Sequence, residues 1–258
     1  MQTVVYDEKN QSALDVYEAS HAKAGIILIH GGGWFRGDKQ KDQHLAEKLV
    51  AEDFTVIVPN YRLAPQNLYP APVMDLLNVY QWTLTNFPQF KGKLAAWGSS
   101  AGGNLAIELA LQKGIPAVSW SGIIDLIDWV SQHEDVVAAM NQEQHFDRKA
   151  SSKIDQDGAN DPFYKWFVLN YVAGDEALLT QADPLQRVTK TSGPLFLANS
   201  LNEFVPLSGV FKLQHALSQE QIETVTQLIP GSAHGEGYLS TAYPQALLFV
   251  KQNLFKID

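Results

Sequence analysis

The chain has 258 residues, of which 45% are hydrophobic and 18% are charged, so it has enough apolar surface to fold around a large core. Its formal net charge is −9, and it has no basic stripe that could follow a phosphate backbone, so nucleic acid is not an expected partner. The absence of cysteine excludes disulfides, thiolate catalysis and cysteine-ligated zinc, and it fits a reducing compartment.

The chain gives no signal for a membrane. Residues 1–10 lack a basic stretch followed by an apolar core, and no apolar run approaches the roughly 18 residues that a membrane span needs. We therefore expect a single domain located in the cytoplasm. Assembly of identical chains is left open by the sequence.

Apolar runs typical of strands alternate with stretches whose apolar residues have helical spacing. Such alternation predicts a mainly parallel sheet with helices on both faces. The clearest strand candidates are 25–30, 54–59, 93–98, 115–121, 194–199 and 224–229.

One interval interrupts this alternation. Residues 125–183 contain no evident strand, and 131–161 is polar and rich in charge and glutamine. We expect an insertion that resembles a small cap above the carboxyl ends of the strands, where ligands bind, with an amphipathic helix over 163–172. A surface excursion without a role in binding fits the sequence equally well.

A serine framed by glycines lies between an expected strand and an expected helix. The segment 98–103 reads GSSAGG, with Ser100 midway between Gly98 and Gly102. A weakly nucleophilic hydroxyl must be held on a tight turn, and small residues two positions away let strand and helix approach. The pattern predicts that Ser100 is a nucleophile, while its neighbour Ser99 lacks the symmetric glycine frame.

A second glycine-rich segment, HGGGW at 30–34, follows the strand expected at 25–30. Its N–H groups, with that of Ala101, are suited to bind the negative oxygen of a tetrahedral acyl intermediate. A phosphate-binding loop is the competing interpretation, but no Gly-Lys-Ser or Gly-Lys-Thr sequence follows.

Four motifs in this order resemble the hormone-sensitive-lipase-like family of α/β-hydrolase esterases: HGGGW at 30–34, YRLAP at 61–65, PAPVMD at 70–75 and GSSAGG at 98–103. The resemblance implies an α/β-hydrolase fold and a carboxylesterase or acetylesterase that cleaves short-chain acyl esters. It also implies oxyanion donors at Gly32, Gly33 and Ala101, with Gly31 shaping the turn. No metal or organic cofactor is required.

The base of a serine hydrolase of this fold comes last in chain order, on a loop after one of the final strands. His234 meets this requirement, since it follows the strand expected at 224–229 and precedes a helix expected around 243–255. We assign His30 a structural role in the glycine loop. The remaining histidines are expected to lie at the surface or in the core: His21, His44, His133, His145 and His215.

The orienting acid is the member that the sequence leaves open. The resemblance places an aspartate three residues before Val205, but that position is Asn202, and Glu203 follows it. An Asp-to-Asn change in a serine triad costs about 10⁴ in turnover. Three alternatives stand: Glu203 with a shifted loop, Asn202 in an altered enzyme, and Asp125 from another strand end.

The sequence predicts two-step acyl transfer through Ser100 and His234. Trp34 and Tyr61 are expected to line the substrate pocket, with Trp166 as a third candidate, although most aromatic residues in such folds pack the core. An amidase or peptidase using the same residues is a second hypothesis. A binding protein that has lost activity is a third.

Overall fold

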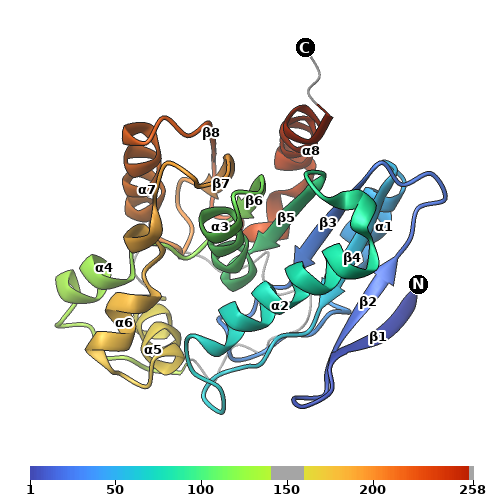
Figure 1. Ribbon diagram of the computed structural model, residues 1–258. Coiled ribbons are helices and arrows are strands. Elements are labelled where there is room, and N and C mark those ends of the chain that lie inside the picture. The colour runs from blue at the N-terminus through green and yellow to red at the C-terminus, as the bar shows by residue number, and fades with distance from the viewer. Residues whose placement is uncertain (141–159, 256–258) are drawn as a thin grey trace.

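The computed structural model of the protein describes residues 1–140 and 160–255 (Figure 1). Its centre is an eight-stranded sheet with the order β1-β2-β4-β3-β5-β6-β7-β8. The strands from β4 to β8 pair in parallel, whereas β1 with β2 and β2 with β4 are antiparallel. The strands are β1 (Gln2–Asp7), β2 (Ser12–Tyr17), β3 (Ala24–Ile29), β4 (Phe54–Pro59), β5 (Leu94–Ser99), β6 (Ala117–Trp120), β7 (Leu195–Ser200) and β8 (Thr224–Ile229).

Helices cover both faces of the sheet, as the alternation of the sequence predicts. Helices α2, α3 and α7 pack on one face, and α1 and α8 pack on the other (Figure 1). Successive residues of β3 enter opposite cores: Ile27 and Ile29 face α2, α3 and α7, while Ile26 and Leu28 face α1 and α8. The helices are α1 (Gln43–Val50), α2 (Ala71–Asn86), α3 (Ala101–Lys113), α4 (Leu126–Gln132), α5 (Asp161–Tyr171), α6 (Glu176–Ala182), α7 (Leu207–Gln219) and α8 (Leu239–Phe255), with short 3₁₀ turns η1 (Pro88–Phe90), η3 (Pro184–Arg187) and η4 (Gly235–Tyr238).

All six strands expected from the sequence are present, but the antiparallel pair β1–β2 was not predicted. β1 is one of the two edge strands and its residues are exposed or half-buried, so it lacks an apolar run. β2 is buried, but Asp15 interrupts its apolar pattern. Both carboxylate oxygens of Asp15 accept hydrogen bonds of 2.7 Å from Lys39 Nζ, and this pairing lets the charge lie within the sheet.

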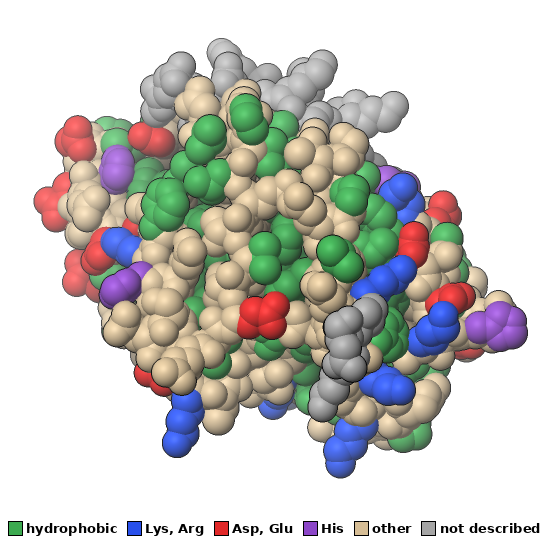
Figure 2. All heavy atoms as spheres, turned by 90° about the horizontal axis from the view of Figure 1, so that it is seen from above, with side chains coloured by type: hydrophobic (Ala, Val, Ile, Leu, Met, Phe, Trp, Pro, Cys, Tyr) green, Lys and Arg blue, Asp and Glu red, His purple; other side chains and the backbone are tan. Residues whose placement is uncertain are grey.

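Charged groups otherwise lie mainly at the surface, where acidic and basic side chains occur among hydrophobic ones on the face shown in Figure 2. A further buried carboxylate, that of Glu108 on α3, pairs with Arg187 of η3 and accepts from Gln112 at 2.8 Å. Burial raises the pKa of Glu108. The pair joins α3 to the end of the interval that separates β6 from β7.

Among its described residues, the interval between β6 and β7 contains helices α4, α5 and α6 and the 3₁₀ turn η3, and no strand. The helix expected over 163–172 is present as α5. Residues 141–159, which include much of the polar stretch and His145, lie outside the described residues. Tyr171 of α5 stacks on Trp34 with ring centroids 4.1 Å apart, so α5 lies against the glycine loop. The division into one domain with a cap at 125–183 stays a prediction.

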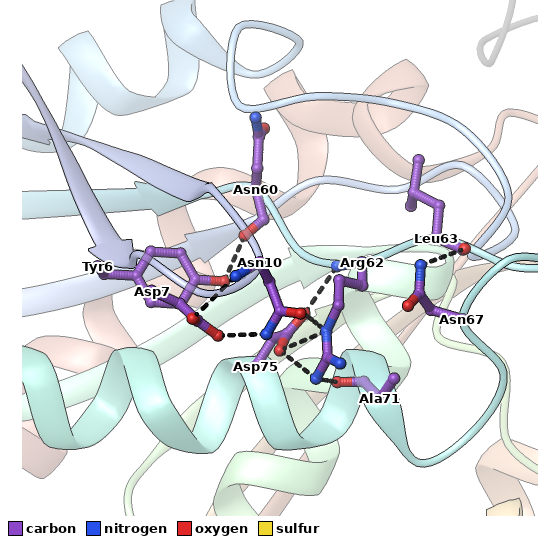
Figure 3. Close-up of polar contacts among 9 residues, drawn as sticks. All are labelled: Tyr6, Asp7, Asn10, Asn60, Arg62, Leu63, Asn67, Ala71 and Asp75. Atoms are coloured by element: carbon purple, nitrogen blue, oxygen red, sulfur yellow. Dashed lines mark hydrogen bonds and ion pairs between the residues drawn. The ribbon is translucent and has the colours of Figure 1, made fainter.

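The segments YRLAP and PAPVMD are joined by an ion pair (Figure 3). Asp75, which is fully buried, accepts from Arg62 Nη2 at 2.7 Å and from the Arg62 backbone N–H at 2.8 Å. Tyr61 and Ala64, in the same segment, donate to the backbone carbonyls of His30 and Trp34, each at 2.9 Å. The YRLAP segment thus holds the backbone of the glycine loop through two hydrogen bonds, and Asp75 of the PAPVMD segment holds YRLAP.

Candidate active site

The residues predicted for catalysis follow the carboxyl ends of parallel strands in one half of the sheet. Ser100 follows β5, Glu203 follows β7, and His234 follows β8. The glycine loop follows β3, which pairs directly with β5. Because the carboxyl ends of parallel strands meet at one edge of a sheet, the fold gathers these groups at one place.

Ser100 occupies a strained turn between β5 and α3. Its backbone has φ 57° and ψ −123°, a conformation that a non-glycine residue adopts only where the surrounding structure imposes it. A Cβ at Gly98 would lie 2.1 Å from the Gly102 carbonyl oxygen, and a Cβ at Gly102 would lie 2.1 Å from that of Ile29. The glycine frame is therefore required by close backbone approach, as the sequence predicts for a nucleophile turn.

The glycine loop packs directly against this turn. A Cβ at Gly31 would lie 3.2 Å from Ser100 Cβ. Gly32 has φ 135° and its carbonyl closes a turn with the N–H groups of Phe35 and Arg36. Within residues 1–140 and 160–255, the N–H groups of Gly32, Gly33 and Ala101 have no hydrogen-bond acceptor. Unpaired N–H groups beside a candidate nucleophile are what an oxyanion site requires.

The aromatic residues beside the loop pack within the protein. Burial lowers the pKa of His30 to about 4, so its imidazole is neutral at physiological pH and Nδ1 donates to the Gly31 carbonyl at 2.9 Å. Tyr61 stacks on His30 with centroids 4.3 Å apart, and Trp34 is fully buried. Trp166 is half-buried and packs edge-on against Phe35. Substrate contact by Trp34, Tyr61 or Trp166 stays a prediction.

His234 and Glu203 form a buried pair. His234 Nδ1 lies 2.6 Å from Glu203 Oε2, and both side chains are at most 4% exposed. The other carboxylate oxygen, Oε1, accepts from the Ser200 backbone N–H at 2.8 Å and from Ser121 Oγ at 2.9 Å. A carboxylate on Nδ1 fixes the tautomer that leaves Nε2 as the base.

The other two candidates for the acid lie elsewhere. The Asn202 side chain is exposed, and its backbone N–H donates to the Gly231 carbonyl at 3.0 Å. Asp125 accepts from Ser208 Oγ and Lys212 Nζ, each at 2.8 Å. Of the three candidates, Glu203 is the one that contacts His234.

The loop that carries His234 packs on the turn that carries Ser100. A Cβ at Gly235 would lie 3.2 Å from Ser99 Cβ. No hydrogen bond joins Ser100 Oγ to His234 in the described residues. Such bonds are often long in unliganded enzymes and shorten only when substrate binds.

Two features of the site were missed from sequence. Ser121, directly after β6, touches both Glu203 and the loop of His234; its position at the end of an expected strand was the available signal. Glu236 is close to the buried carboxyl of Asp42, and burial and the charge of Asp42 raise the pKa of Glu236 to about 9. Lys41, which opposes this shift, lies beside Gly31.

The described residues offer no cluster of three or more His, Cys, Asp or Glu side chains that could hold a metal ion. In the same part of the chain, none of the helices combines the length and the apolar character needed to cross a membrane.

Comparison with known proteins identifies relatives of this chain. The family model described as BD-FAE matches residues 14–217. The chain is 30% identical over 236 residues to versiconal hemiacetal acetate esterase of Dothistroma septosporum, which covers 87% of this chain and 70% of that protein. It is 24% identical to esterase LipC of Mycobacterium tuberculosis, and the match covers 93% of this chain but only 60% of LipC.

Solved structures resemble the protein along nearly its full length. An esterase of Pyrobaculum calidifontis superimposes with a TM-score of 0.74 at 18% identity, covering 100% of this chain and 85% of that one. An esterase/lipase from an uncultured bacterium gives a TM-score of 0.71 at 20% identity, covering 98% and 82%. At these identities the likeness concerns the fold, and it confirms the predicted α/β-hydrolase architecture.

Proposed function

The chain belongs to the BD-FAE family of hormone-sensitive-lipase-like esterases and is a carboxylic ester hydrolase, and from this we propose that it cleaves small or short-chain acyl esters through an acyl-enzyme on Ser100. The observation that carries the proposal is the 2.6 Å contact between His234 Nδ1 and Glu203 Oε2, on a loop packed against the turn of Ser100. A binding protein without activity is not favoured.

In the acylation step Ser100 Oγ attacks the ester carbonyl carbon, and His234 Nε2 takes the hydroxyl proton. The carbonyl oxygen becomes negative and accepts hydrogen bonds from the N–H groups of Gly32, Gly33 and Ala101. The C–O bond to the alcohol then breaks, the alcohol leaves with the proton held by His234, and the acyl group remains on Ser100. Glu203 keeps its own charge and stabilises the imidazolium.

In the deacylation step a water molecule takes the place of the alcohol. His234 removes one proton from this water as its oxygen bonds to the acyl carbon. The same N–H groups hold the second tetrahedral oxyanion. Collapse breaks the bond to Ser100, which regains its proton from His234, and the carboxylic acid is released.

The preference for a small, apolar acyl group is inferred from aromatic packing around the site. The Phe204 ring lies 4.5 Å from that of His234, and Phe167 contacts both Phe204 and Trp34 with centroids about 6 Å apart. A Cβ at Gly33 would lie 3.2 Å from Phe167. Rings this close to the glycine loop favour apolar groups and restrict their length. A cytoplasmic location stays a prediction.

The test is hydrolysis of p-nitrophenyl acetate, butyrate and octanoate, with a matched anilide of each acid to measure amidase activity. We expect rates that fall with chain length and esters that are cleaved much faster than anilides. The variant Ser100→Ala should lose at least about 10⁴-fold in kcat and should not react with an active-site phosphonate. Ser99→Ala is the matched control and should keep the label. Phosphonate labelling of Ser100→Ala at the wild-type rate would contradict the assignment.

A further inference from the structure

Ser121 connects the acid of the proposed triad to the loop of the base. Its side chain is fully buried directly after β6. Its Oγ lies 2.9 Å from Glu203 Oε1 and accepts from the Gly235 backbone N–H at 2.8 Å. Gly235 is the residue that follows His234. One hydroxyl oxygen thus touches the groups that place both members of the pair.

We propose that Ser121 is a positioning residue for this site, and that it fixes the Glu203 carboxylate relative to the backbone of the His234 loop. The inference rests on the function proposed above, since it concerns how that triad is held. Ser121 touches no reacting atom and acts through Glu203 and Gly235.

The direction of its hydrogen bonds follows from counting protons. A serine hydroxyl has one proton and two lone pairs. The Gly235 N–H occupies one lone pair, and the hydroxyl of Tyr238, 2.7 Å away, is placed to occupy the other. The Ser121 proton then points to the ionised Glu203, which is the strongest acceptor in reach. The Tyr238 hydroxyl also lies 2.7 Å from the Ala198 carbonyl, its alternative acceptor.

The acid of this chain needs such a support because it is a glutamate. Glutamate has one more rotatable bond than aspartate, so its carboxylate loses more rotational freedom when it is fixed. Ser121 and the Ser200 N–H both hold Oε1. With Oε1 held by two donors, Oε2 is left for His234 Nδ1, and rotation of the carboxylate away from the imidazole is opposed.

Two variants of Ser121 separate the effect of losing its hydroxyl from the effect of its backbone strain. Its φ is 51°, which favours glycine over residues with a Cβ. Ser121→Ala removes the hydroxyl and keeps the strain, whereas Ser121→Gly removes the hydroxyl and relieves the strain. An effect shared by both variants belongs to the hydroxyl.

Ser119 provides the matched control. It lies on β6 two residues before Ser121, and its buried Oγ has no hydrogen-bond partner among the described residues. Ser119→Ala therefore removes a buried hydroxyl from the strand that precedes Ser121 without changing the contacts of Glu203. Tyr238→Phe removes the hydroxyl that orients the Ser121 proton and leaves the contact between Ser121 and Glu203 in place, so it tests that orientation alone.

The experiment measures kcat, KM and the pH profile of kcat/KM on p-nitrophenyl acetate for these four variants, with thermal unfolding as the check of folding. We expect both Ser121 variants to lose roughly ten- to a hundredfold in kcat, the usual effect of a lost bond to a charged group, with KM nearly unchanged. A carboxylate that loses a donor binds a proton more readily, so the acid limb of the profile should move to higher pH. Tyr238→Phe should lose less, and Ser119→Ala should match the wild type.

The outcomes separate this inference from the proposed function. If the wild type is active and Ser100→Ala is not, but both Ser121 variants keep the wild-type kcat and pH profile, the inference is overturned and the proposed function stands. If the wild type neither cleaves the esters nor reacts with the phosphonate, the proposed function fails and the inference falls with it. Should Ser121→Ala not fold, Ser121→Gly carries the test alone.

Discussion

The Nδ1 atom of His234 and the Oε2 atom of Glu203 lie 2.6 Å apart although 31 residues separate them in sequence. The pair exists because β7 and β8 are parallel neighbours, so the loops after them begin at the same edge of the sheet. Asn202, one residue earlier, points to solvent. In the triad proposed here, the acid lies one residue further along the loop than Asn202, and the longer glutamate side chain reaches the imidazole.

Replacing Glu203 by glutamine tests its charge. Glu203→Gln preserves the size of the side chain but removes the negative charge that stabilises the imidazolium, and we expect kcat to fall by about 10⁴. Steady-state kinetics on p-nitrophenyl acetate measure the loss. The neighbouring change Asn202→Ala should leave kcat within about twofold. A large loss in Asn202→Ala with little loss in Glu203→Gln would show that Glu203 is not the acid.

Adding a methyl group at Gly32 tests the oxyanion donors. A Cβ there would lie 2.1 Å from the Arg36 carbonyl oxygen, at a φ of 135°, so Gly32→Ala must displace the N–H groups of the loop. We expect a 10²- to 10³-fold loss in kcat, about the effect of one oxyanion donor elsewhere. Gly92→Ala is the control, because a Cβ at Gly92 meets nothing within 4 Å at a φ of 74°. Equal activities for the two variants would argue against the loop as the donor site.

The raised pKa of Glu236 predicts a pH dependence of stability. The pKa is about 9 in the folded protein and 4.5 ordinarily, so between these values the folded chain holds a proton that the unfolded chain has released. The free energy of unfolding therefore falls as pH rises through that window. Asp42, Lys41 and His44 are the ionisable groups around Glu236.

The variant Glu236→Gln cannot titrate and should show a flatter dependence. Urea unfolding at about pH 5 and about pH 9 measures it, and the stability of the variant relative to the wild type should rise between the two. Glu220→Gln, at an exposed glutamate, should follow the wild type. A constant difference between Glu236→Gln and the wild type would show that Glu236 does not change its protonation on folding.

The Arg62–Asp75 pair predicts an asymmetry between two truncations. Asp75 is fully buried, whereas the Arg62 side chain is 26% exposed. Arg62→Ala leaves a buried charge without its partner and should cost about 3–5 kcal/mol of unfolding free energy. Asp75→Ala leaves a cation that water can reach and should cost less. Urea unfolding measures the loss of unfolding free energy in the two variants. A loss in Asp75→Ala that equals or exceeds that in Arg62→Ala would contradict the burial argument.

The strands and the nucleophile turn could be predicted because their signals are local. Gly98 and Gly102 flank Ser100 in the sequence, and the close approach that requires Gly98 lies within the same turn, whereas the one that requires Gly102 involves Ile29 of β3. The β1–β2 pair could not, because Asp15 interrupts its apolar run and the partner of that charge, Lys39, lies on another loop.

Distant contacts explain what the sequence left open in the site. The choice between Asn202 and Glu203 depends on a one-residue displacement of a loop, to which strand patterns are insensitive. Ser121 contacts Glu203 across 82 residues, and its place at the end of an expected strand indicates only that it lies at the same edge of the sheet. Trp34 is buried because α5, from a distant segment, packs on it.

The stacking of Trp34 on Tyr171 has a consequence for selectivity. Trp34 directly follows Gly33, so the peptide that would bind the oxyanion and the helix α5 are joined through one pair of rings. An ester bulky enough to push α5 outward would pull the donors away from the carbonyl oxygen at the same time. Such a substrate would still bind but would react slowly, so that the enzyme would discriminate against size in its turnover number more than in its affinity.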